Sequence, residues 1–219
     1  MNNNKTIAEM SEMLGGILTG AMIRSEVANG HIAISDFNEK QLNPNSYNLR
    51  IGSKVAMIAP TSYVEYWGSP EPDKNGVVNS VMIKRQRPVW ELDIKKPIEL
   101  EVHDIPADGM VLQPQQLYLI STEERIECGI YVPIITGRSS MGRMGIEVHR
   151  EAGFGDIGYE GCFTLQMDVS LPTRIYPYAE MAQVYFITPC GPIEKRYSGK
   201  YQGSTDIAAS RSYIDFSNN

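Results

Sequence analysis

The segment Tyr131–Gly145, YVPIITGRSSMGRMG, joins the two features that decide the fold: a short apolar run and a cluster of turn residues. The run Tyr131–Ile135 contains a proline and ends two residues before Gly137, which is typical of a strand and unfavourable for a helix. Similar runs recur between Pro88 and Phe186 at the spacing of sandwiches and barrels. They are Val111–Leu112, Leu117–Ile120, Cys162–Met167 and Gln183–Phe186. The sequence therefore predicts a mainly β protein, a sandwich or jelly roll.

The N-terminal part has a different pattern. Apolar residues near helical spacing predict helix over residues 6–29, with a second short helix over Gly20–Ala28 that ends near Gly30. After a turn at Pro44, alternating apolar residues from Tyr47 to Ile51 predict a strand. We therefore expect short N-terminal helices ahead of the β region.

Two segments differ in composition from the rest of the chain. Residues 62–82 are rich in Pro, Gly, Ser and Asn and predict a surface loop or arm, whose role as an interface stays open. The polar tail 190–219 carries aromatic and basic residues, so we expect it to order over a ligand. No second apolar core follows either segment, and residues 1–219 are predicted to form a single domain.

Charge and cysteine content restrict the possible partners and the compartment. The 219-residue chain has a net charge of −6, which argues against a partner such as a nucleic-acid polymer. Positive and negative charges balance from Arg138 to Arg211, so this part remains suited to one small polyanion. Three cysteines without a CxxC pair favour a reducing cytoplasm. No apolar run approaches the roughly 20 residues of a membrane span, and the N-terminus is unlike a signal peptide.

The cluster Gly137–Gly145 is the densest chemical signal in the chain. Arg138 and Arg143 supply charged forks, Ser139 and Ser140 supply hydroxyls, and three glycines leave backbone N–H groups accessible. These groups suit a phosphate chain. An exposed basic turn remains an equally good explanation of the spacing alone.

A second glycine-rich stretch, Ala152–Gly161, contains Asp156 and Tyr159. A carboxylate in such a turn can approach a ligand closely, where Asp156 would hold a sugar hydroxyl or orient a water molecule. The alternative is an Asx turn that caps its own loop.

Other catalytic classes fit poorly. His149-Arg150-Glu151 matches the H-x-E part of a zinc deaminase, but Ile193 stands where the P-C-x-x-C motif from Pro189 needs its second cysteine. A zinc ligand set is therefore incomplete. His149 is interpreted as a core or interface histidine. The sequence also contains no G-x-S-x-G elbow, Walker A loop or Rossmann fingerprint.

Taken together, these motifs resemble the dCTP deaminase and dUTPase superfamily, and their order is more similar to the dCTP deaminase branch. The central block comprises Arg138–Ile146, His149, Ala152–Phe154, Asp156, Gly158, Tyr159 and Gly161. An N-terminal block, Asn43–Gly52, and two C-terminal blocks, Lys200–Gly203 and Ser210–Tyr213, also agree, with a weaker match at Met181–Gln183. The resemblance covers residues 18–216 except the insert.

The resemblance implies a distorted β-sandwich of the dUTPase-like type that assembles as a homotrimer with nucleotide sites between subunits. Mg²⁺ would bind through the triphosphate, with no protein metal ligand and no zinc. The implied roles of individual residues fall into four groups. Arg138, Ser139, Ser140 and Arg143 bind phosphate or orient water, Asp156 contacts the deoxyribose, Thr164 and Leu165 offer backbone groups to the pyrimidine, and Tyr197 and Lys200 close over the triphosphate.

Two positions depart from the family pattern. Gln166, 28 positions after Arg138 without a gap, stands where the deaminases carry the catalytic glutamate. An amide cannot accept the proton that this glutamate shuttles, and such acid–base help is worth about 10²–10⁴ in rate. The second departure is Ser204, which stands where the tail motif of the family usually ends in glutamine.

Three explanations of Gln166 stay open: an engineered Glu→Gln change, natural divergence, and rescue by a nearby carboxylate such as Glu151 or Glu160. The leading hypothesis is a dCTP deaminase-like hydrolase that converts dCTP to dUTP and ammonia. The alternatives are a dUTP or related dNTP diphosphatase that releases pyrophosphate, and a noncatalytic trimeric dNTP-binding or regulatory protein.

Overall fold

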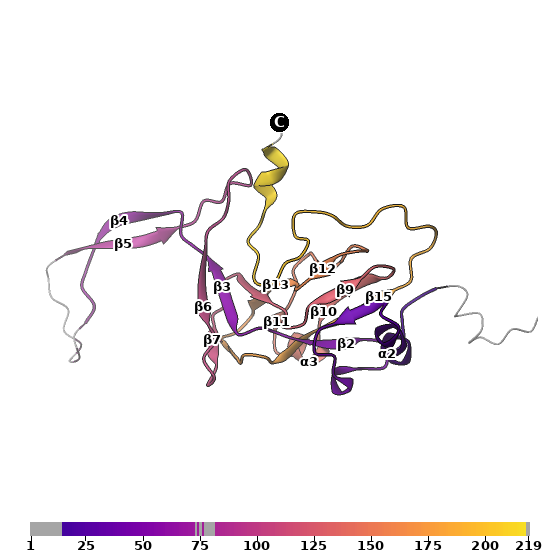
Figure 1. Ribbon diagram of the computed structural model, residues 1–219. Coiled ribbons are helices and arrows are strands. Elements are labelled where there is room, and N and C mark those ends of the chain that lie inside the picture. Colours follow the sequence, from indigo (N-terminus) through magenta and orange to yellow (C-terminus); the bar gives the residue numbers. More distant parts are fainter. Residues whose placement is uncertain (1–14, 73, 75, 77–81, 218–219) are drawn as a thin grey trace, which may run out of the picture. The chain divides into compact units, whose positions relative to one another are not determined.

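The computed structural model describes residues 15–72, 74, 76 and 82–217 (Figure 1). Its contacts divide the chain into two compact units. The main unit contains the described residues up to 57 and residues 102–208. The arm unit contains residues 58–101 and those from 209 onward. The prediction of a single domain stays a prediction.

Antiparallel sheets build most of the main unit. A three-stranded sheet has the order β10 (Val132–Gly137), β15 (Glu180–Ile187), β2 (Tyr47–Arg50). A five-stranded sheet has the order β11 (Ile146–Glu147), β13 (Thr164–Val169), β8 (Tyr118–Ser121), β3 (Lys54–Ile58), β6 (Leu100–Asp104). Two smaller sheets are β1 (Ile32–Ile34), β9 (Ile126–Cys128), β12 (Glu160–Gly161), and β14 (Thr173–Ile175) with β7 (Met110–Leu112). The predicted mainly β class is confirmed.

Alternation along the strands explains where the core lies. In β13, Leu165, Met167 and Val169 are buried, and the residues between them are partly exposed. Successive side chains of a strand point to opposite faces, so one face of β13 joins the hydrophobic core and the other carries polar groups. Tyr47 and Phe186 from the three-stranded sheet belong to the same core.

The described N-terminal residues contain one α-helix, α2 (Gly20–Ala28), and a 3₁₀ turn η1 (Glu39–Gln41). The Thr19 hydroxyl caps α2 by accepting a hydrogen bond from the Met22 N–H at 3.3 Å. The prediction of this helix is confirmed. Helix over residues 15–19 is wrong, because Gly15 and Gly16 have positive φ and Ile17 bridges Ile187. Residues 6–14 lie outside the described part.

The arm unit contains a hairpin where the sequence predicts a loop or arm. Strand β4 (Ser62–Gly68) pairs antiparallel with β5 (Ile83–Val89) along its whole length. The 3₁₀ helix η2 (Ser212–Phe216) also belongs to this unit, where the Ser212 hydroxyl donates to the Ile94 carbonyl at 2.9 Å. The role of the arm stays open.

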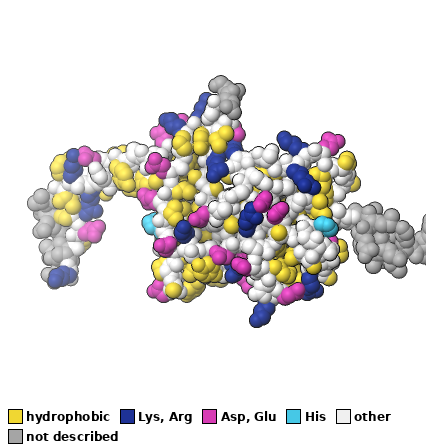
Figure 2. Space-filling model, viewed as in Figure 1, with side chains coloured by type: hydrophobic (Ala, Val, Ile, Leu, Met, Phe, Trp, Pro, Cys, Tyr) yellow, Lys and Arg dark blue, Asp and Glu magenta, His cyan; other side chains and the backbone are white. Residues whose placement is uncertain are grey.

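On the face that Figure 2 shows, basic and acidic side chains are interspersed. No helix among the described residues is long and apolar enough to cross a membrane.

The short helix α3 (Ser139–Arg143) follows β10 directly.

Candidate functional site

Arg138 lies at the junction of β10 and α3, where it is the N-cap residue of the helix. Its backbone N–H donates to the Met181 carbonyl at 3.2 Å. Its side-chain Nη1 donates to the Glu180 carbonyl at 2.7 Å and lies 3.3 Å from the Glu180 carboxylate. The side chain remains 32% exposed, so part of the guanidinium is accessible to a ligand.

Arg138 and Ser139 line an open cavity of about 390 Å³, here called the arginine cavity. Its wall consists of Ile135–Ser139, Gly142, Ile146–Glu151 and Gly153. Gly153 is required here, because a Cβ at this position would overlap the Ile135 carbonyl oxygen. Ser140 and Arg143 lie on α3 beside the cavity but do not line it.

The arginine cavity also contains charged groups other than Arg138. Arg150 lines it and donates to Asp168 at 2.6 Å, and Glu147 and Glu151 add two carboxylates. Glu151, one of the two carboxylates considered as a rescue for Gln166, therefore lies on the same cavity wall as Arg138. Glu160, the other, is ion-paired with Arg125.

Gln166 lies on the polar face of β13, and its amide orientation follows from two neighbours. Its Nε2 donates to the Thr164 carbonyl at 3.4 Å, and its Oε1 lies 3.4 Å from His149 Nδ1. Because a carbonyl oxygen requires a donor, the amide nitrogen faces Thr164 and the amide oxygen faces His149. His149 then donates through Nδ1. Burial lowers the pKa of His149, which favours the neutral ring at pH 7.

The interpretation of His149 as a core histidine is supported in part. The side chain is partly buried, and among the described residues its Nε2 has no hydrogen-bond partner. The residue also lines the arginine cavity, so it connects Gln166 to Arg138 and Ser139.

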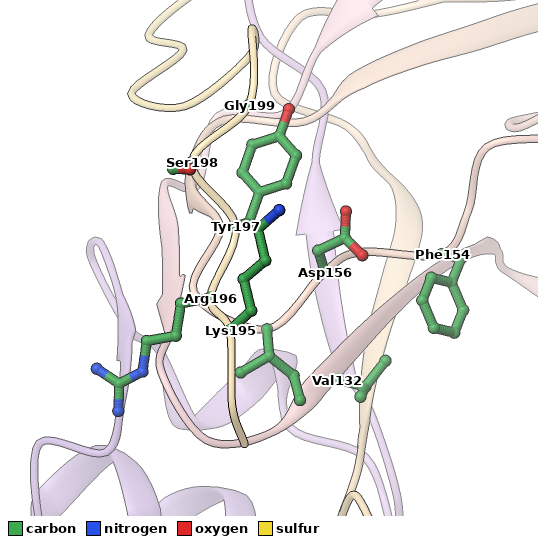
Figure 3. A pocket seen from close by; sticks show the side chains of 9 residues that line it. Val132, Phe154, Asp156, Lys195, Arg196, Tyr197, Ser198 and Gly199 are labelled. Carbon is green, nitrogen blue, oxygen red and sulfur yellow. The ribbon is translucent and has the colours of Figure 1, made fainter.

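A second cavity, of about 590 Å³, lies along the tail and is here called the tail cavity (Figure 3). Asp156 and Tyr197 line it, as the resemblance implies for a sugar contact and a closing residue. Lys195 extends beside Tyr197 toward the side of the cavity where Asp156 lies, whereas the Arg196 side chain points away. Gly158, with φ of +87°, leaves room for Arg196, since a Cβ there would come 2.7 Å from the Arg196 Cβ.

The tail is held by backbone contacts to its own chain. Tyr197 N–H donates to the Ile157 carbonyl at 2.8 Å, and the Ser204 carbonyl accepts from Cys162 N–H at 2.8 Å. Further along, the Ala208 N–H donates to the Thr164 hydroxyl at 3.0 Å. The tail therefore runs along residues 157–164, and Ser204 lies at the end of β12 through a parallel bridge to Gly161.

The predicted site residues thus form separate groups in one chain. The arginine cavity contains Arg138 and Ser139, the tail cavity contains Asp156 and Tyr197, and the two cavities share no lining residue. Leu165 is fully buried, so its side chain is not accessible to a ligand. Lys200 lines neither cavity.

Several residues of the two cavities were not predicted from the sequence, although some of them had a recognisable signal there. Lys195 and Arg196 immediately precede Tyr197, so a basic pair beside a predicted closing residue was visible. Arg150 lines the arginine cavity and Glu180 contacts Arg138, and neither placement has a local signal in the sequence. Among the described residues, no group of three or more His, Cys, Asp or Glu side chains is arranged to hold a metal ion.

Comparisons with known proteins point to one family. A family model described as dCTP deaminase-like matches residues 17–188. A protein named "dCTP deaminase, dUMP-forming" from Clostridium acetobutylicum is 38% identical over 202 residues, which cover 92% of this chain and 99% of the relative. A protein of the same name from Hathewaya histolytica is 37% identical over 200 residues, which cover 91% and 99%.

Among solved structures, the 2'-deoxycytidine 5'-triphosphate deaminase from Agrobacterium tumefaciens matches with a TM-score of 0.54 and 20% identity. The match covers 80% of this chain and 49% of that one, so the chain spans about half the length of that structure. The fold and the sequence relatives define a class of protein, the enzymes of nucleotide metabolism with a dCTP deaminase-like β fold. More particularly, the chain belongs to the dCTP deaminase-like family.

Proposed function

We propose that this protein is a pyrimidine deoxynucleoside triphosphate hydrolase on a dCTP deaminase framework, with dUMP as its end product. Release of pyrophosphate is the step that its residues support fully, and deamination of dCTP is slow because Gln166 replaces a carboxylate. The observation that carries the proposal is the combination of Arg138 and Ser139 on the wall of the arginine cavity with an amide at position 166.

The phosphate part of the proposal follows from the chemistry of the arginine cavity. Hydrolysis of a phosphate chain depends mainly on positioning and on stabilising negative charge. Arg138 offers a partly exposed guanidinium for this, and Ser139 offers a hydroxyl beside it. Neither contribution needs a carboxylate at position 166.

The deamination part follows from proton transfer. Removal of the cytosine amine requires a group that takes a proton from water and gives it to the leaving ammonia. The Gln166 amide cannot do so at neutral pH. The names of the two relatives specify dUMP, and the dUTP product expected from the sequence is not confirmed.

The partners of the reaction remain part of the proposal. Two cavities that share no residue within one chain support a site completed by a second copy, in a homotrimer. We expect Mg²⁺ to bind through the triphosphate, where it would neutralise phosphate charge. The three cysteines are free, and burial raises the thiol pKa of Cys128 and Cys162, which fits the proposed cytoplasmic location.

Parallel measurement of ammonia and pyrophosphate tests the function. The protein is incubated with dCTP, dUTP and each other dNTP in the presence of Mg²⁺. We expect pyrophosphate from a pyrimidine deoxynucleotide and little ammonia from dCTP. Saturable nucleotide binding without either product would replace the proposal by the noncatalytic dNTP-binding alternative, which the amide at Gln166 favours.

Replacing Arg138 by Ala tests the phosphate contact. A hydrogen bond from a charged group is worth roughly 1.5–3 kcal/mol, so we expect affinity for a triphosphate to fall about tenfold to a hundredfold. Isothermal titration with the α,β-imido analogue of dUTP measures this effect. Arg24→Ala is the matched control, because Arg24 forms an exposed ion pair with Glu39 and lines neither cavity. Unchanged affinity in Arg138→Ala would remove Arg138 from the phosphate site.

A further inference from the structure

We infer that Glu180 is a positioning residue that fixes the Arg138 guanidinium at the arginine cavity, so that its remaining N–H groups meet the phosphate chain. This inference rests on the proposed function, because it gives Arg138 a phosphate ligand. Glu180 itself does not line the cavity. It acts through Arg138.

The first observation is an irregularity in β15. Glu180 pairs with Arg50 and Ala182 pairs with Leu49, so Met181 is an extra residue opposite one step of β2. Such a β-bulge bends the strand and re-aims side chains, and bulges are frequent beside active sites. At this bulge the Met181 carbonyl accepts from the Arg138 backbone and the Glu180 carbonyl accepts from its side chain.

The second observation is the double contact between Glu180 and Arg138. Nη1 of the guanidinium meets the Glu180 carbonyl at 2.7 Å and a carboxylate oxygen, Oε2, at 3.3 Å. A guanidinium has five N–H donors in a rigid plane, so fixing one nitrogen orients the others. The contact leaves the opposite edge of Arg138 for a ligand.

The third observation is a chain of polar contacts that holds Glu180 from behind. Asn48, which is buried, donates through Nδ2 to the same Oε2 of Glu180 at 2.8 Å. Asn43 in turn donates to Asn48 Oδ1 at 2.7 Å. The Glu180 carboxylate is therefore restrained from both sides, unlike the carboxylate of a mobile surface ion pair. This chain also links the segment Asn43–Asn48 to the phosphate-binding arginine.

The nearby Gln183 supports the same junction. Its Oε1 accepts from the Ser46 hydroxyl at 3.1 Å, and its Nε2 donates to the Gly137 carbonyl at 3.3 Å. The backbone directly before Arg138 is thereby held by β15 as well. Arg138 is thus restrained at the preceding residue, at its own N–H and at its side chain.

A double-mutant cycle tests the inference. Affinity for the α,β-imido analogue of dUTP is measured by titration for the wild type, Glu180→Ala, Arg138→Ala and the double variant. We expect Glu180→Ala to weaken binding about threefold to tenfold, a modest loss because both side chains are about one-third exposed. In the Arg138→Ala background, the same change is expected to have no further effect.

Further variants separate positioning from charge and from folding. Glu180→Gln keeps an oxygen for Nη1, so we expect affinity within about twofold of the wild type. Glu39→Ala breaks an arginine–carboxylate pair outside both cavities and is expected to leave affinity unchanged. With dUTP as substrate, KM should rise in Glu180→Ala while kcat stays constant. Thermal unfolding of each variant shows whether it is folded.

The outcomes distinguish this inference from the proposed function. Weakened binding in Arg138→Ala, together with an equal effect of Glu180→Ala in both backgrounds, would overturn the positioning role and leave the phosphate site intact. Tighter binding in Glu180→Ala would also overturn it, since the carboxylate would then act by repelling phosphate. Unchanged binding in Arg138→Ala would overturn both.

Discussion

Replacing Gln166 by Glu is expected to raise the rate of ammonia release from dCTP by about 10²–10⁴-fold, the usual value of general acid–base help. The new carboxylate would stand where the Gln166 amide now lies, on the polar face of β13 and about 3.4 Å from His149 Nδ1. There it can take a proton from water and pass it to the leaving amine. Continuous detection of ammonia with dCTP and Mg²⁺ measures the rate.

Two control variants make the Gln166→Glu result specific. Gln113→Glu adds a carboxylate at an exposed position that lines neither cavity, and we expect no gain in ammonia release. Gln166→Ala should release as little ammonia as the wild type. Pyrophosphate release from dUTP shows that the site is intact. Equal ammonia from Gln166→Glu and the wild type would mean that position 166 is not the proton-transfer position.

Removing the carboxylate of Glu124 is expected to lower the free energy of unfolding by about 3 kcal/mol, the lower end of the range for buried ion pairs that lose one partner, because the Arg50 side chain is 28% exposed. Glu124 is fully buried. Its carboxylate accepts from Gln41 Nε2 at 2.9 Å, from the Arg50 N–H at 2.8 Å and from Arg50 Nε at 2.7 Å. In Glu124→Ala these three donors lose their acceptor in the protein interior. Urea denaturation followed by circular dichroism measures the change.

Glu127→Ala is the matched control for Glu124→Ala. Glu127 lies on the neighbouring strand β9 with its side chain exposed, and surface changes of this kind usually stay within about 0.5 kcal/mol. The hydrogen bond to Glu124 also raises the pKa of Arg50, which keeps that guanidinium charged. A loss of under about 1 kcal/mol in Glu124→Ala would show that the interior rearranges or admits water to satisfy Arg50.

The repeated short apolar runs predict part of the strands. The runs at Leu117–Ile120, Cys162–Met167 and Gln183–Phe186 overlap β8, β13 and β15, because period-two burial leaves a local signal. The apolar spacing wrongly predicts helix over residues 15–19. The positive φ of Gly15 and Gly16 is incompatible with a helix there. The composition of residues 62–82 predicts a loop or arm, because turn-forming residues follow β4, whereas the structure pairs β4 with β5 as a hairpin.

By itself, the sequence determined the fold class and led to the hypothesis that Arg138 and Ser139 bind phosphate. It also determined that position 166 carries an amide, since residue type and ungapped spacing are local properties. Only the tertiary structure decided that Glu180 contacts Arg138, because a bulge in β15 brings together residues 42 positions apart. It likewise separated Asp156 and Tyr197 from Arg138 into two cavities. Such contacts depend on strand register and packing, which leave no pattern in the neighbouring sequence.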